Sequence, residues 1–359
     1  MAIHTVSINP WLRYLILGAF ALLILAGCMS VSPQHVTTDR MDYGQVLAES
    51  WKRQTLLNVV RMRYADAPIF LDISSIINSY SVGGKASAGF TQQSRPDPSI
   101  FTIGADSNWS NTPTVTYQPV MGDRFTKSML QPVPPSAIFE LLQGGWPADI
   151  VLPTVVGSIN GLRNSFGGVA ADAGFTQLVA ALTRIQRAGG LSIRIEARKN
   201  GSALVLVIRR AASDAELSKD AFIVRSLLGL QENISEIVID YGLLPKNNSE
   251  IAVLSRSMLN IILMLGFGVD LPAGHAQEGR ALLGRWQEGD VQATPLVHIH
   301  SGKVAPTDAY AAVSYKGHWF WVADTDIASK RTFTFLMILF SLAETGQASA
   351  APLVTVPSR

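Results

Sequence analysis

The sequence predicts an α+β fold: an antiparallel or mixed sheet built of hairpins with interleaved helices, after an N-terminal helical and long β-hairpin portion. Two hairpin signals carry this prediction. Residues 78–118 contain two runs of period-two alternation around a turn-rich break, and residues 191–208 contain two strand-like runs around Asn200-Gly201. Helical periodicity lies between hairpins rather than between single strands, which distinguishes this pattern from a parallel α/β sheet.

The N-terminus carries a targeting signal. An apolar run over residues 15–25 follows Arg13 and ends in LAGC (residues 25–28), which resembles the lipobox of bacterial lipoproteins. We therefore expect residues 1–27 to be a signal peptide and Cys28 to be the lipidated residue. The alternative is an uncleaved membrane helix from Trp11 to Met29, but the apolar run is shorter than the roughly 20 residues that span a bilayer.

The resemblance to lipoproteins implies a location. Several acyl chains on Cys28 give lasting attachment, because each buried CH₂ adds about 0.8 kcal/mol. Met29 stands where inner-membrane lipoproteins carry an aspartate. We therefore expect a lipid-anchored protein of the outer membrane, with the periplasmic face favoured over the cell surface.

Composition narrows the classes of partner and site. The 29 basic and 27 acidic residues nearly balance, which argues against a nucleic-acid partner because such binding neutralises several phosphates. Cys28 is the only cysteine, so intramolecular disulfides and cysteine-ligated metal sites are excluded. Hydrophobic residues make up 48% of the chain, which fits a fold held together by packing.

Beyond the signal peptide the chain is predicted to have four parts. Residues 28–40 are a polar tether, residues 41–168 an N-terminal helical and hairpin portion, residues 169–345 an α+β portion, and residues 346–359 a disordered tail. The first portion begins with a helix over residues 42–64 and ends with short helices over residues 122–165, punctuated by prolines. Gly167-Gly168 mark the boundary between the two large portions.

The hairpin over residues 78–118 has one apolar and one polar face on each strand. Tyr80, Phe90, Phe101 and Trp109 lie near the strand ends, as in the aromatic girdles of membrane strands, and are candidate interaction residues. Two strands of roughly ten residues could cross a bilayer, although several subunits would have to complete the sheet. Alternatively, Gly83-Gly84 form a tight turn, which leaves a small hairpin packed on the domain or on a partner.

The C-terminal portion is predicted from its periodicity and its turn residues. Asp172 caps a helix, and Asn200-Gly201 form a type I′ turn whose second strand is central in its sheet. In the first strand Ile193 and Ile195 face inward. The further elements are helices over residues 214–228, 249–264 and 329–344, and strands over residues 236–241, 295–301, 309–315 and 318–323.

Three segments together resemble an uncharacterised family of bacterial lipoproteins. They are WKRQTLLNVVRMRYADAPIFLDISSI (Trp51–Ile76), GWP (Gly145–Pro147) and GHWFWVADTDIASKRTFTFLMILFSL (Gly317–Leu342). The resemblance spans most of the mature chain. It implies an envelope lipoprotein, and it implies neither an activity nor functional residues.

Signatures of common enzymes are missing from the sequence. The P-loop, the G-x-S-x-G elbow and the H-E-x-x-H helix do not occur, and Gly266-Phe267-Gly268 indicates the end of a helix rather than a dinucleotide site. No cofactor is expected.

One pattern could bind a metal ion. His298 and His300 share a strand face, and His318, Asp324 and Asp326 lie on or after a neighbouring strand. The sequence fixes no third ligand, and solvent-facing histidines are ordinary, so no metal site is predicted. Asp326 is better explained as the cap of the last helix.

Two further groups of residues have an ordinary explanation and a functional one. Trp319 and Trp321 flank Phe320 on one strand and are candidates for a ligand platform, although packing in the core is favoured. A polar site near the first helix is less favoured than solvated charges on its surface; its members would be Arg61, Arg63, Asp66 and Asp72.

The sequence therefore predicts a non-enzymatic, lipid-anchored envelope protein that binds another envelope component. The alternative is an oligomeric channel or export lipoprotein that inserts the hairpin of residues 78–118 into the membrane. A hydrolase ranks third, because no nucleophile is marked by its surroundings. The expected partners are the membrane, through the lipid, and another envelope protein or a second copy of the chain.

Overall fold

The computed structural model describes residue 11 and residues 33–91, 100–198, 201–209, 215–234, 236–284 and 291–344. The expected signal peptide, Cys28 and the tail over residues 346–359 lie outside these ranges. The chain divides into two compact units, Met1–Lys52 and Arg53–Arg359, and helix α2 (Pro33–Arg63) runs across the division. Within the described ranges, no helix combines the length and hydrophobicity that a membrane span requires.

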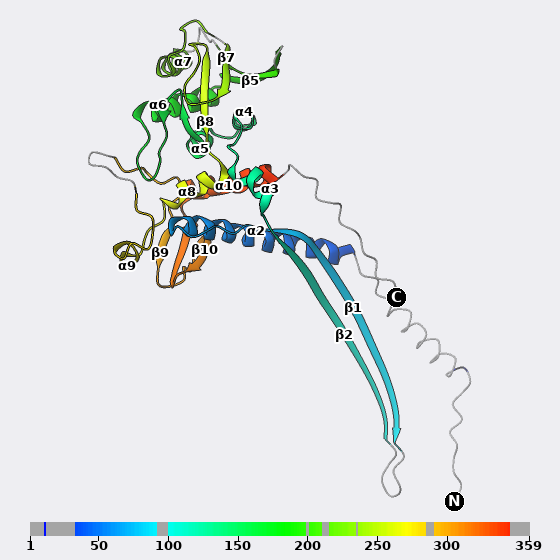
Figure 1. Cartoon of the computed structure of the whole chain (residues 1–359). Helices are drawn as coiled ribbons and strands as arrows, with labels where there is room; N and C mark the ends of the chain where they lie inside the picture. The colour runs from blue at the N-terminus through cyan, green and yellow to red at the C-terminus, as the bar shows by residue number, and fades with distance from the viewer. Residues whose placement is uncertain are drawn as a thin grey trace, which may run out of the picture. The chain divides into compact units, whose positions relative to one another are not determined.

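The predicted α+β fold is confirmed. Its larger sheet has the order β4-β3-β8-β7-β6-β5 (Figure 1, green to yellow). Neighbouring strands are antiparallel except for the parallel pair β7 and β8. The strands are β3 (Val156–Ile159), β4 (Leu162–Arg163), β5 (Leu191–Arg198), β6 (Gly201–Ile208), β7 (Glu236–Tyr241) and β8 (Glu250–Ser255). Because β3 and β4 precede residue 168 and the others follow it, the boundary expected at Gly167-Gly168 falls within one sheet.

Two helices connect the strands of this sheet and pack against each other. They are α6 (Ala173–Arg187) and α7 (Ala215–Leu228). The apolar stripe of α6 is buried, as its spacing predicts, and Phe175, Leu178 and Ile185 are at most 2% exposed. Arg184 of α6 donates two hydrogen bonds to the buried Asp220 of α7, from Nε at 2.9 Å and from Nη2 at 2.6 Å.

A smaller antiparallel sheet has the order β10-β11-β9. The three strands are β9 (His300–Gly302), β10 (Ala309–Tyr315) and β11 (His318–Ala323), and the bounds of β10 and β11 coincide with the predicted strands. The strand expected over residues 295–301 is wrong for its first part, because the backbone bends at residues 296 and 297 and β9 begins only at His300. Helices α8 (Met258–Gly266) and α9 (Ala273–Gln277) precede this sheet, and α10 (Ile327–Glu344) follows it. This last helix, predicted to be buried, is buried along one side only, and residues near both of its ends are exposed. On the buried side Phe335 packs on Trp146 with ring centroids 5.1 Å apart, and Phe340 packs on Phe70.

The segment between the ribbon β1–β2 and the larger sheet forms short helices, as the spacing of its prolines predicts. They are α3 (Gly122–Phe125), η1 (Thr126–Leu130), α4 (Pro135–Gln143) and α5 (Ala148–Val155). Pro135 occupies the first position of α4, where its missing N–H costs no intrahelical hydrogen bond.

Two helices differ from expectation. Helix α2 begins at Pro33 rather than near residue 42, because Pro33 is tolerated at the start of a helix and no breaker follows it for ten residues, so part of the segment expected as a tether is helical. The helix expected over residues 249–264 is instead strand β8 followed by α8. Five of the six residues of β8 are buried, and such a run does not show whether it is helix or strand. Ser257, rather than Ser249, caps α8, accepting from the Asn260 N–H at 3.2 Å.

The hairpin β5–β6 is confirmed, and Gly201, expected in its turn, is the first residue of β6 and pairs with Arg198. The rest of the expected turn, at Lys199 and Asn200, lies outside the described ranges. Strand β6 is interior, as its continuous apolar run predicts, while β5 is an edge strand. Ile193 is buried as expected, whereas Ile195, farther along this edge strand, is 62% exposed, so the expected burial is wrong there.

Candidate functional site

The predicted hairpin over residues 78–118 is a two-stranded ribbon about twice as long as expected. Strands β1 (Leu71–Thr91) and β2 (Ile100–Pro119) pair in antiparallel register along their whole length, with one bulge near Ile73 (Figure 1). At about 3.4 Å per residue, each strand is roughly 70 Å long. No third strand joins this sheet among the described residues.

The ladder of the ribbon runs through the glycines that could have broken it. Gly83 pairs with Asn108 and Gly84 with Ser107, so the alternative of a tight turn at Gly83-Gly84 is wrong. Glycine can adopt the extended backbone of a strand. The alternating residues on both sides of Gly83-Gly84 fix the register of the two strands, in spite of the turn propensity of the two glycines. Lys85 lies directly opposite Asp106, which places complementary charges on one face of the ribbon.

The polar face of the ribbon is accessible to solvent. Lys85, Ser87 and Gly89 on β1 and Thr102 and Asp106 on β2 are exposed. The register places Phe90 opposite Phe101, Val82 opposite Trp109 and Tyr80 opposite Asn111. The side chains of the candidate residues Tyr80, Phe90, Phe101 and Trp109 are not among those that the structure describes, so their role stays a prediction.

Side-chain amides of α2 hold the base of the ribbon. The buried Asn58 amide donates to the Ile69 carbonyl at 2.8 Å and accepts from the Ile69 N–H at 2.9 Å. One turn earlier, Gln54 makes the same pair of bonds with Leu71, at 3.2 and 3.1 Å. The two amides therefore act as a short strand beside the start of β1. On the other side, Arg124 binds Asp72 at 2.5 Å.

The aromatic residues of β11 divide between two faces. Phe320 is fully buried, whereas Trp319 and Trp321 lie on the opposite face and are partly buried. The ring of Trp321 covers Gly302 of the neighbouring strand, since a Cβ on that glycine would come within 3.2 Å of the ring. Packing within the smaller sheet thus accounts for part of the Trp321 surface, and its role as a ligand platform stays a prediction.

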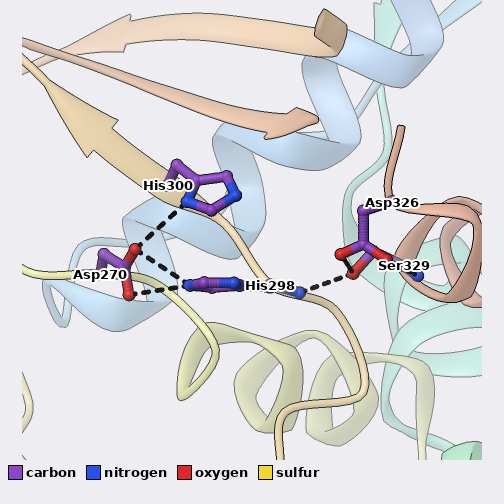
Figure 2. A network of polar contacts seen from close by, with 5 residues as sticks. All are labelled: Asp270, His298, His300, Asp326 and Ser329. Carbon is purple, nitrogen blue, oxygen red and sulfur yellow. Dashed lines mark hydrogen bonds and ion pairs between the residues drawn. The ribbon is translucent and has the colours of Figure 1, made fainter. Parts of the chain in front are cut away.

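A cluster of two histidines and one aspartate lies where α8 meets the smaller sheet (Figure 2). Nε2 of His298 is 3.1 and 3.0 Å from the two carboxylate oxygens of Asp270, and Nδ1 of His300 is 3.5 Å from Asp270 Oδ2. The imidazole rings of His298 and His300 are 4.2 Å apart between centroids. All three side chains are accessible, with exposed fractions of 34–51%.

The backbone explains why these three side chains meet. Val269 and Ile299 form a parallel bridge in which the Asp270 N–H donates to the Ile299 carbonyl and the Ile299 N–H donates to the Gly268 carbonyl. Val269 and Ile299 are buried. Because side chains alternate along extended backbone, the residues next to this bridge point the other way, toward solvent. Asp270, His298 and His300 therefore share one side.

The main chain of His298 is held by the start of α10 (Figure 2). The His298 N–H donates to Ser329 Oγ at 2.8 Å, and that hydroxyl donates to the Asp326 carboxylate at 2.5 Å. Asp326 also accepts from the Ser329 N–H at 3.0 Å, so it caps α10 as the sequence predicts. The hydrogen bonds to Ser329 hold the pKa of Asp326 below its usual value.

His318 and Asp324, which the sequence placed near this pair, lie elsewhere. Asp324 binds Lys330 at 2.6 Å. His318 is buried with its ring 4.7 Å from that of His275, whose Nδ1 is 2.7 Å from the Tyr64 hydroxyl. Burial, followed by the nearby His318, lowers the pKa of His275. The residue that completes the cluster with His298 and His300 is Asp270, which sequence reasoning missed.

Asp66, Asp72 and Arg63, three of the four charges near the first helix, have separate partners; the fourth, Arg61, is close enough to Asp66 to help lower its pKa. Asp66 binds Lys316 at 2.7 Å and accepts from the Tyr315 hydroxyl, and these bonds lower its pKa. Asp72 binds Arg124, as described above. Arg63 is buried beneath Phe267, and burial lowers the pKa of its guanidinium. The prediction that these charges are solvated on the surface of the helix is therefore wrong for Arg63.

Comparisons of the chain with family models, with curated proteins and with solved structures give no match. The resemblance to bacterial lipoproteins therefore stays a prediction.

Proposed function

We propose that this chain is a lipid-anchored protein of the outer membrane with a structural or binding role, and that the ribbon β1–β2 is its contact element. The lipid would hold the chain at the periplasmic face through Cys28. The ribbon would bind another envelope protein or a second copy of the chain. The observation that carries this proposal is the length of a ladder that no third strand joins in the described part of the chain.

The physical argument concerns the outer edges of the two strands. An isolated two-stranded ribbon is marginally stable in water, and three strands or a packed face are normally needed. Asn58 and Gln54 pair with the backbone at Ile69 and Leu71, at the start of β1. Beyond the base, the outward N–H and C=O groups of both strands can pair with a strand of a partner. Edge addition therefore suits this ribbon better than a catalytic role does.

The anchor is tested by the substitution Cys28→Ser. The lipobox places the only thiol of the chain at the predicted cleavage point. We expect the variant to lose all incorporation of labelled palmitate and to accumulate as an unprocessed precursor, because serine offers no thiol for the lipid. Labelling that persists in the variant would contradict the proposal.

Insertion of the ribbon into the membrane is the second candidate. The unbroken alternating ladder with an exposed polar face supports it, since a membrane strand needs one face toward lipid and one toward water. Several copies would have to pair their edges, because unpaired backbone groups are costly in hydrocarbon. The strands are about twice the 9–11 residues that a crossing requires, so at most half of the ribbon would lie within the bilayer.

Single cysteines at positions 85, 86, 87 and 88 separate the two candidates. Acylated Cys28 has no free thiol, so each introduced cysteine reports its own position. Insertion predicts alternating labelling by lipid-soluble and water-soluble reagents. Contact with a protein partner predicts protection from both reagents in cells, which is lost after purification in denaturant. Uniform labelling by the water-soluble reagent in cells would contradict both candidates.

A further inference from the structure

The geometry points to a mononuclear site for a divalent transition-metal ion of the Zn²⁺ class, held by Asp270, His298 and His300. This inference is independent of the proposed function, because the cluster lies on the smaller sheet and shares no residue with the ribbon. In the described part of the chain, these three side chains each offer one potential ligand atom, and the three atoms all lie within 4.8 Å of one another.

The spacing of the ligand atoms matches what such an ion requires. Zn²⁺ binds imidazole nitrogen and carboxylate oxygen at about 2.0–2.2 Å in tetrahedral geometry, which puts neighbouring ligand atoms about 3.3 Å apart. The distances from Asp270 oxygens to His298 Nε2 and His300 Nδ1 are 3.0 and 3.5 Å. Small rotations of the three side chains would therefore suffice to place one ion between them.

Supporting contacts set the positions of the ligands. The parallel bridge of Val269 and Ile299 fixes the backbone on both sides, and the buried Ser329 fixes the main chain of His298. Trp321 lies beside His300, with ring centroids 5.5 Å apart and an interplanar angle of 33°. These contacts hold the main chain of His298 and one face of the His300 ring, and so limit the movement of two of the three ligands.

Stability alone gives a weaker account of the cluster. An exposed pair of a histidine and a carboxylate contributes little to stability, because water screens the attraction between the two groups. A second histidine on the same carboxylate adds little, because two protonated rings 4.2 Å apart repel each other. A metal ion, in contrast, uses both rings in the neutral form and the carboxylate as the counter-charge.

The donor set also indicates the class of ion. Imidazole favours Zn²⁺, Cu²⁺, Ni²⁺ and Fe²⁺, whereas Mg²⁺ and Ca²⁺ prefer sites made of oxygen ligands. Three protein ligands leave a fourth tetrahedral position open, and the exposed fractions of the three side chains allow water or a ligand to reach it.

Binding of Zn²⁺ and Co²⁺ to the full chain, purified in detergent without a polyhistidine tag, tests this inference. We expect one Zn²⁺ per chain, no competition by excess Mg²⁺ or Ca²⁺, and a Co²⁺ absorption spectrum typical of tetrahedral coordination. The substitutions Asp270→Asn and His298→Gln should each weaken Zn²⁺ binding at least about tenfold. Replacing even a residue that only hydrogen-bonds to a metal ligand typically lowers metal affinity by that factor.

Asp324→Asn is the matched control. This substitution removes the same charge as Asp270→Asn, but from an exposed carboxylate outside the cluster that is paired with Lys330. The affinity for Zn²⁺ should therefore stay within about twofold of that of the unaltered chain. Circular dichroism checks that each variant is folded, and the Co²⁺ spectrum of the unaltered chain needs no variant. A chain that binds neither ion, or an Asp270→Asn variant that binds as the unaltered chain does, would overturn the inference.

Discussion

Replacing Phe320 with alanine is expected to lower the free energy of unfolding by about 3–5 kcal/mol. Phe320 is fully buried on the inner face of β11, and its ring lies edge-on to Tyr64 at 6.1 Å between centroids. The substitution removes these contacts and leaves a cavity where α2 meets the smaller sheet. Because domains are stable by only about 5–15 kcal/mol, denaturant titration should show a large shift of the midpoint.

The matched control for Phe320→Ala is Trp319→Phe, one position away on the same strand. Trp319 lies on the opposite, partly buried face, so a smaller aromatic ring there should cost less than about 1.5 kcal/mol. Equal losses in the two variants would show that the faces of β11 are not divided as described.

The second large effect is expected for Gly268→Ala. A Cβ at this position would overlap the carbonyl oxygen of Val297 and approach the Pro295 Cβ to 3.0 Å. The backbone around residue 297 cannot move away from Gly268 without breaking the hydrogen bond from the Ile299 N–H to the Gly268 carbonyl at 2.9 Å. Overpacking of this kind costs about 1–3 kcal/mol or more. The melting temperature should fall, and the alignment of Asp270 with His298 should be lost with it.

Gly274→Ala provides the control for Gly268→Ala. A Cβ on Gly274, in α9, would meet nothing closer than the Glu278 side chain at 3.9 Å. Alanine is favoured over glycine in a helix by up to about 1 kcal/mol, so this variant should be neutral or slightly more stable. If both variants melt alike, the close approach at Gly268 is not a constraint on the fold.

The sequence predicts the smaller sheet and α6 well because their local signals agree with their surroundings. Lys316-Gly317 turns between two alternating runs, and both strands end where the pattern ends. The stripe of α6 is ended by Gly189, whose positive φ suits the end of a helix. At such positions propensity, periodicity and burial point to one structure.

Elsewhere the deciding interaction is distant in the sequence. Residues 250–255 form a strand because β3 and β7 pair with both edges of β8, and no period-two pattern marks this. The length of the ribbon depends on continuous pairing across Gly83-Gly84. Asp270 is 28 residues from His298, and only the bridge between Val269 and Ile299 brings the two together. Sequence spacing alone could find the histidine pair but not its third partner.

The measurement that tests the proposed function most directly is the mass of the protein after cross-linking in intact cells. It compares the unaltered chain with a variant in which Asn-Gly replaces residues 82–109. Ser81 and Ser110 are opposite in the ladder, so a two-residue turn can close the shortened ribbon without changing its base. If the ribbon is the contact element, the unaltered chain is recovered at a mass above that of one chain and the variant as a single chain with an unchanged melting temperature. Recovery of both proteins as single chains, or at the same higher mass, would contradict it.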